Sequence, residues 1–168
     1  NNWWTKTISK TDFNEHFQTV AGYYPEEIEG IINKVRSKKS TLNVLLELLE
    51  ERNLTLLMNI LEPSLFGFIS TIILTCQDFV DNSKSWEIAL IAYISLSKPV
   101  NTNAFSQQTM LLLAKELNKS YSEILVELTA YSDKKIEQKQ HRYHALKQII
   151  RQELRFNRQP TILDNLET

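Results

Sequence analysis

The stretch from Trp86 to Leu128 constrains the fold most, because its apolar residues recur at the three- and four-residue spacing of a helix face. An apolar run from Trp86 to about Leu96 predicts one helix, and the polar segment Lys98–Asn103, which includes a proline, predicts a break. A second helix is expected from near Ala104 to Leu117, and Ser120 is placed to cap a third. Helices joined by short polar breaks are typical of interaction and scaffold proteins.

Composition favours helices in the rest of the chain as well. Three glycines and four prolines in 168 residues are fewer turn formers than a sheet protein of this size needs. The segment Tyr131–Phe156 contains neither residue type, so it is predicted to form one long C-terminal helix. We therefore predict an all-α fold, with a single compact domain of about seven helices at residues 11–156. An aromatic segment at residues 1–10 precedes this domain, and a flexible tail at residues 157–168 follows it.

Local signals predict where helices in the first half begin and end. Either Ser9 or Thr11 can cap the first helix, and Gly22 is placed to end it in a left-handed conformation. Pro25 suits the first turn of the second helix. Asn53 is predicted to separate two later helices.

The predicted core draws on apolar positions from every helix. Its first stripe comprises Phe13, Phe17 and Val20 at helical spacing. A helix from Ser64 to about Val80 is apolar on most sides, which predicts burial, and Ser83 or Ser85 can cap the helix after it. The core residues we expect are Phe17, Ile31, Leu45, Leu48, Ile69, Ile72, Trp86, Leu90, Tyr93, Leu112, Leu113, Leu117, Leu125 and Ile149.

Charge and hydropathy argue against two classes of partner. The formal net charge of −1 offers no broad basic surface for non-specific binding of nucleic acid. No apolar run reaches the ~18 to 20 residues that a membrane-spanning helix needs. The sequence begins at Asn1 without a methionine and shows no signal peptide, so we expect a piece of a longer protein whose ends do not reveal its location.

Few residues in the sequence are candidates for metal binding or catalysis. His141 and His144 are three residues apart and would share a helix face, with Glu137 as a third metal ligand, but a solvated polar face is the favoured interpretation. Cys76 is the only cysteine and lies in an apolar run, so we expect a buried side chain and not a nucleophile. We predict no catalytic residue, no cofactor and no metal.

A series of motifs between Leu56 and Tyr131 carries a family resemblance. In chain order they are Leu61-Glu62-Pro63 with Phe66 and Phe68-Ile69, Trp86-Glu87, Ala92-Tyr93-Ile94, Asn103 with Phe105, the leucine-rich run 111–117, and Ser120-Tyr121 leading to Leu128. In this order they resemble the contractile injection system tape measure family of phage-tail-like particles. The family often has a charged or glycine-containing turn where this chain has Ser97-Lys98-Pro99, and only one copy of the unit is present.

The resemblance implies a non-enzymatic structural or assembly module that sets inner-tube length in a contractile injection particle. Its partners would be inner-tube and baseplate proteins, in the bacterial cytoplasm during assembly or inside the assembled particle, and a homo-oligomer is a further expectation. The candidate protein-binding residues are Trp3, Trp4, Phe66 and Phe68. The alternatives are a helical adaptor or regulatory module that lays a helix in a groove, and a helical enzyme built on His141 and His144.

Overall fold

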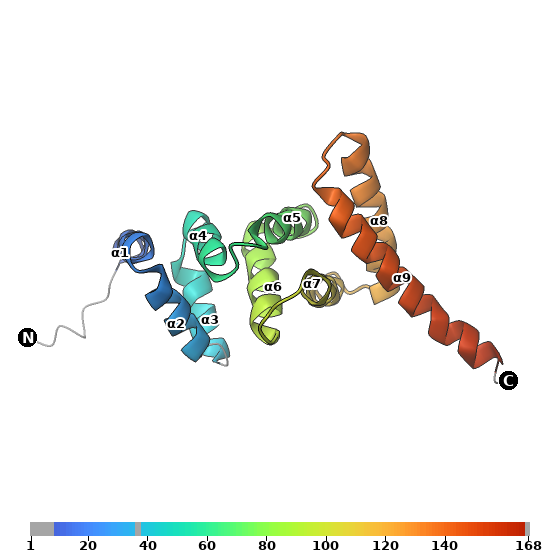
Figure 1. Cartoon of the computed structure of the whole chain (residues 1–168), viewed down its shortest axis with the longest axis horizontal. Coiled ribbons are helices and arrows are strands. Elements are labelled where there is room, and N and C mark those ends of the chain that lie inside the picture. The colour runs from blue at the N-terminus through green and yellow to red at the C-terminus, as the bar shows by residue number, and fades with distance from the viewer. Residues whose placement is uncertain (1–8, 36–37, 167–168) are drawn as a thin grey trace, which may run out of the picture. The chain divides into compact units, whose positions relative to one another are not determined.

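The computed structural model describes residues 9–35 and 38–166, with side chains described for residues 9–34 and 38–156. These residues form nine helices and no strand, which confirms the all-α prediction although about seven helices were expected. The prediction of one compact domain is not confirmed, because the chain divides into two compact units, Asn1–Phe66 and Gly67–Thr168. The helices are labelled in Figure 1.

Four helices make up the described part of the first unit. They are α1 (Lys10–Tyr23), α2 (Pro25–Val35), α3 (Lys39–Leu48) and α4 (Glu51–Leu61). Helix α4 contacts α1 and α2, and α1 also contacts α2 and α3. Ser9 caps α1, because its Oγ accepts a hydrogen bond from the backbone N–H of Asp12 at 3.1 Å. Pro25 begins α2, as predicted.

Helix α1 turns a different side to the core from the one its sequence predicts. Its buried residues are Asn14 and Ala21, whereas Phe17 is half-buried and Val20 is exposed. Gly22 lies inside the helix and has no positive φ, so the prediction that it ends α1 in a left-handed conformation is wrong. The apolar stripe therefore lies at the edge of the core and not at its centre.

The break that separates α3 from α4 is also displaced from its predicted position. It falls at Leu49 and Glu50, while Asn53, where we expected it, is fully buried inside α4. The carbonyl of Leu48 and the N–H of Glu50 both hydrogen-bond to the side chain of Asn14, at 2.8 Å each. A side chain distant in sequence thus satisfies backbone groups on both sides of the break.

The second unit contains five helices, the first of which begins at the division between the units. They are α5 (Phe66–Gln77), α6 (Asn82–Ser95), α7 (Thr102–Glu116), α8 (Tyr121–Glu137) and α9 (Tyr143–Leu166). Helices α6, α7, α8 and α9 contact one another in chain order, and α7 also contacts α9. Helix α5 is shorter at both ends than the helix we predicted from Ser64 to Val80.

Three helices of this unit have side-chain caps. Ser120 and Glu123 form the capping box that their spacing predicts at the start of α8. Asn101 caps α7 through a 2.7 Å bond from the N–H of Ala104. Helix α6 is capped by Asp81, not by Ser83 or Ser85, because the Asp81 carboxylate accepts from a backbone N–H three residues later.

The predicted helix Tyr131–Phe156 is wrong, because a turn at residues 138–142 divides it between α8 and α9. Lys139 adopts a left-handed conformation with φ 61°. Two hydrogen bonds close the end of α8, from the N–H of Gln140 to the carbonyl of Lys135 at 3.0 Å and from the N–H of Lys139 to the carbonyl of Ile136 at 2.9 Å. This is a Schellman motif, which a lysine completes here without glycine.

Most of the predicted core residues in the second unit are buried, and those in the first unit are not. Buried as predicted are Ile69, Ile72, Trp86, Leu90, Tyr93, Leu113, Leu125 and Ile149. Half-buried are Phe17, Leu45, Leu48, Leu112 and Leu117. Ile31 is 57% exposed, so its assignment to the core is wrong, and its neighbours Ile28 and Ile32 are buried in its place. Ile28 and Ile32 are four residues apart and share one face of α2, whereas Ile31 lies three residues after Ile28 and directly before Ile32, so the apolar pattern alone did not decide which of the three is covered.

None of the helices in the described part of the chain has the length and apolar character that a membrane crossing requires.

Candidate protein-binding surfaces

Two tyrosines at the junction of α1 and α2 are the most exposed aromatic residues in the described part of the first unit. Tyr23 is 78% exposed and Tyr24 is 61% exposed, and their ring centroids are 6.4 Å apart. Val20, 40% exposed, lies one helical turn before Tyr24. We call Val20, Tyr23 and Tyr24 the tyrosine patch. Large exposed apolar groups that lie together are a common sign of a protein contact.

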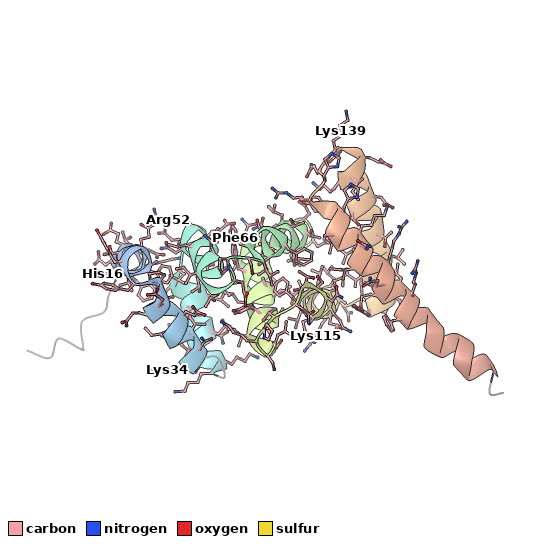
Figure 2. All side chains as sticks on the ribbon, in the orientation of Figure 1. His16, Lys34, Arg52, Phe66, Lys115 and Lys139 are labelled. Atoms are coloured by element: carbon pink, nitrogen blue, oxygen red, sulfur yellow. The ribbon has the colours of Figure 1, made fainter. Side chains whose placement is uncertain are left out.

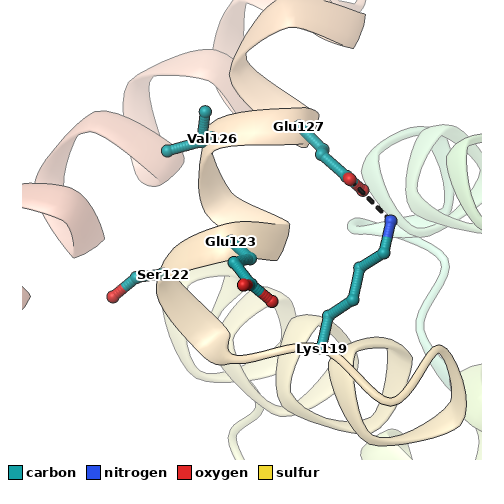
Figure 3. A pocket seen from close by; sticks show the side chains of 5 residues that line it. All are labelled: Lys119, Ser122, Glu123, Val126 and Glu127. Atoms are coloured by element: carbon teal, nitrogen blue, oxygen red, sulfur yellow. Dashed lines mark hydrogen bonds and ion pairs between the residues drawn. The ribbon is translucent and has the colours of Figure 1, made fainter.

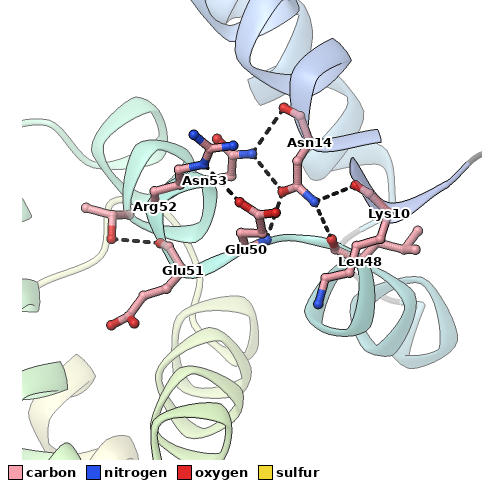
Figure 4. A network of polar contacts seen from close by, with 8 residues as sticks. Lys10, Asn14, Leu48, Glu50, Glu51, Arg52 and Asn53 are labelled. Carbon is pink, nitrogen blue, oxygen red and sulfur yellow. Dashed lines mark hydrogen bonds and ion pairs between the residues drawn. The ribbon is translucent and has the colours of Figure 1, made fainter. Parts of the chain in front are cut away.

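The buried amide of Asn14 holds α1 in the rotation that leaves the tyrosine patch in solvent. Figure 4 shows this side chain between the end of α3 and the start of α4. Its Nδ2 donates to the carbonyls of Lys10 at 2.7 Å and Leu48 at 2.8 Å, and its Oδ1 accepts from the N–H of Glu50. Asn53 donates to the same Oδ1 at 2.7 Å. Because a buried amide must keep these partners, α1 cannot rotate its apolar stripe fully into the core.

A second exposed aromatic residue lies on α9 in the other unit. Phe156 is 69% exposed. The hydroxyl of Tyr121, the first residue of α8, donates to the carboxylate of Glu153 at 2.7 Å. Residues of α9 after Glu153 therefore extend past the start of α8, as Figure 1 shows. We call the part of α9 from residue 154 onward the α9 extension.

A cluster of aromatic and charged side chains connects α8 and α9 near the turn that joins them. The hydroxyl of Tyr131 donates to the carboxylate of Asp78 at 2.5 Å, and the Tyr131 ring meets that of Tyr143 edge to face at 5.8 Å. Lys135 lies over the Tyr131 ring, with its Nζ 5.4 Å from the ring centroid. Burial, reinforced by the bond to Asp78, raises the pKa of the Tyr131 phenol above its usual range. The phenol therefore stays a hydrogen-bond donor to Asp78 and connects α8 to the residue that follows α5.

A surface hollow of about 530 Å³ lies beside the start of α8. Its lining residues are Lys119, Ser122, Glu123, Val126 and Glu127, shown in Figure 3. The charged groups already have partners, since Lys119 pairs with Glu127 and Glu123 closes the capping box. Val126, 57% exposed, is the apolar group at this surface. The hollow thus offers no unpaired charge that would select a ligand.

The structure describes only two of the four residues that the sequence suggested for protein binding. Trp3 and Trp4 lie outside the described residues. Phe66 and Phe68 lie in the first turn of α5, where both are half-buried, and Figure 2 labels Phe66. Their role in binding stays a prediction. The sequence analysis missed Tyr23 and Tyr24, although two adjacent tyrosines before a helix-starting proline could have been recognised as a helix junction that exposes aromatic rings.

Cys76 is buried in α5, at 1% exposure, and burial raises the pKa of its thiol to about 12. We expect a disulfide reagent such as DTNB at pH 8 to label it at least roughly a thousandfold more slowly than a free thiol, because few molecules carry the reactive thiolate. Adding denaturant should restore full labelling of one thiol per chain, which is the control. Labelling in native buffer at the rate of glutathione would contradict this expectation.

Comparison with protein-family models, with curated proteins and with solved structures finds no match for this chain.

Proposed function

We propose that this chain is a non-enzymatic assembly module that binds further copies of itself through the tyrosine patch and the α9 extension. The observation that carries this proposal is the exposure of Tyr23, Tyr24 and Phe156, each more than 60% exposed. Tyrosine and phenylalanine contribute much apolar area at protein interfaces, and tyrosine is frequent among the residues whose loss weakens binding most. Their exposure on helices that buried contacts hold in place favours a preformed contact surface.

Opposite charges beside the two aromatic surfaces support a contact between them. Glu26 and Glu27 are exposed in the first turn of α2, next to the tyrosine patch. Arg151 and Arg155 are exposed on α9, five residues and one residue before Phe156, respectively. The surface around Phe156 of one copy therefore complements the tyrosine patch of another. Because the two surfaces differ, this contact adds copies head to tail and leaves one surface of each kind free at the ends.

The finer role we propose is that of a tape measure module in a contractile injection particle. It is supported by the motifs between Leu56 and Tyr131 that resemble the tape measure family, and it involves binding of inner-tube and baseplate proteins. Trp3, Trp4, Phe66 and Phe68 are the further contact residues in this role. A helical adaptor for an unrelated partner is the alternative, and it predicts a chain that does not associate with itself.

Static light scattering across a concentration series tests the self-association. We expect the average mass of the wild-type chain to rise with concentration. Two variants, Tyr23→Ser/Tyr24→Ser and Phe156→Ser, should each remain monomeric alone because each lacks one of the two surfaces. Mixed in equal amounts, they should form a dimer and nothing larger, since each supplies the surface that the other lacks.

Val126→Ser is the matched control, because Val126 is an exposed apolar residue outside both surfaces. It should associate as the wild type does, and circular dichroism should show the same helix content for all variants. A wild-type chain that stays monomeric throughout would refute self-assembly and favour the adaptor. Association lost in Phe156→Ser but retained in the tyrosine variant would instead mean that α9 pairs with itself.

A further inference from the structure

Two histidine side chains meet at the turn between α8 and α9. Nδ1 of His141 lies 3.5 Å from Nε2 of His144, and the two rings are within 7° of parallel, with centroids 5.6 Å apart. Both side chains are exposed, so this nitrogen pair is accessible from solvent. In the neutral state one of the two nitrogens holds the proton of the hydrogen bond and the other accepts it. We propose that a divalent first-row transition-metal ion takes the place of this proton and binds both imidazoles.

The separation of the nitrogens is close to what one metal ion requires. Zinc–nitrogen bonds are about 2.0 to 2.1 Å long, so two nitrogens on one tetrahedral ion lie about 3.3 Å apart. The observed 3.5 Å is close to this distance. The nearly parallel rings face each other through these nitrogens, so each ring must turn about its side-chain bonds until its lone pair points at the common ion. When both rings are neutral, binding needs only a tautomer change that moves the shared proton to the far nitrogen of its own ring, so no net proton is released.

The backbone that carries the pair is held in place before any ion binds. The N–H of His144 donates to the carbonyl of His141 at 3.2 Å. Tyr143, between the two histidines, is 2% exposed and packs against Tyr131. The Schellman motif at Lys139 fixes the turn on the other side. Little backbone ordering is then needed on binding, which favours affinity.

The donor set defines the class of ion. Imidazole nitrogen suits nickel, copper and zinc, whereas magnesium and calcium prefer oxygen. Among the described residues no group of three or more histidine, cysteine, aspartate or glutamate side chains could hold an ion, so Glu137 is not the third ligand considered from the sequence. Water or donors from another molecule would fill the remaining positions. Lys139 and Arg142 flank the pair and add no attraction, so we expect moderate affinity.

Calorimetric titration of the metal-free chain with Ni²⁺ tests the site. We expect one ion per chain at this site, with His141→Ala and His144→Ala each weakening that binding by about tenfold or more. His16→Ala is the matched control, because His16 is an exposed histidine on α1, labelled in Figure 2, and its loss should leave the affinity unchanged. Mg²⁺ at the same concentration should give no heat of binding.

Two results would overturn the proposal. One is Ni²⁺ binding that persists unchanged in His141→Ala and in His144→Ala, which would place the ion elsewhere. The other is an equal loss in His16→Ala, which would mean that single exposed imidazoles bind the ion independently. Both site histidines are exposed, so the variants should fold, and circular dichroism of each before titration verifies this.

Discussion

Asn14→Ala should lower the free energy of unfolding of the first unit by about 3 to 5 kcal/mol. The substitution removes the acceptor for the N–H of Glu50 and the donor to the carbonyl of Leu48. It also removes one of the two acceptors of the Asn53 amide, which keeps its bond to the backbone carbonyl of residue 14. Each buried polar group left unpaired costs about 1 to 3 kcal/mol. The ends of α3 and α4 also lose their connection to α1, so the effect should exceed that of an ordinary helix cap.

Hydrogen–deuterium exchange measured by mass spectrometry can locate this effect. Peptides from α1, α3 and α4 should exchange faster in Asn14→Ala than in the wild type, because their opening becomes less costly. Asn33→Ala is the control, since Asn33 is exposed on α2 and its loss should change stability by less than about 0.5 kcal/mol. If these peptides exchanged at the same rate in Asn14→Ala as in the wild type, the hydrogen bonds of the Asn14 amide would contribute little to stability.

Ile150→Ala should destabilise the second unit by about 2 to 5 kcal/mol, the usual range for removing a buried isoleucine side chain. Ile150 is 0% exposed on α9, where α9 packs against α8. The cavity left behind removes contacts with the apolar side of α8, whose buried residues include Ile124, Leu125 and Leu128. Loosening this pair should also free the α9 extension, which the bond from Tyr121 to Glu153 otherwise anchors.

Chemical denaturation followed by circular dichroism measures the loss, and the rate of Cys76 labelling provides a second readout within the same unit. We expect a lower midpoint and faster thiol labelling in Ile150→Ala. Phe156→Ala on the same helix is the control, because that side chain is 69% exposed and leaves no cavity. If the two substitutions had equal effects, the buried face of α9 would not be the source of its stability.

Local signals explain which helix boundaries could be predicted. Ser120 and Glu123 are three residues apart, and the capping bonds they make connect only those residues. Pro25 acts through its own φ angle, so its position at the start of α2 needs no knowledge of the fold. Lys139 shows the limit of such signals, because it takes the left-handed conformation normally indicated by glycine. Nothing in its residue type predicted the end of α8.

The sequence predicted the fold class better than it predicted the candidate binding surfaces. A pattern of apolar residues predicts that a helix has a buried side, but it does not say how much of that side other helices cover. Val20 and Ile31 both match such a pattern and are exposed. The spacing of His141 and His144 predicted a shared helix face, which is wrong because His141 lies in the turn before α9. This turn brings the two nitrogens to 3.5 Å.

The amino-acid sequence alone was enough to predict an all-α fold, a buried Cys76, and helices that begin at Pro25 and after Ser120, because local patterns along the chain carry these signals. For the first helix it left Ser9 and Thr11 as possible caps, and the structure shows Ser9. Which side of α1 faces the core and where α3 ends depend instead on contacts between residues far apart in the sequence. The side-chain amide of Asn14 hydrogen-bonds to Leu48 and Asn53, which lie 34 and 39 residues further along the sequence. A buried amide must satisfy its hydrogen bonds, and that requirement outweighed the apolar stripe of α1 and left Tyr23 and Tyr24 in solvent.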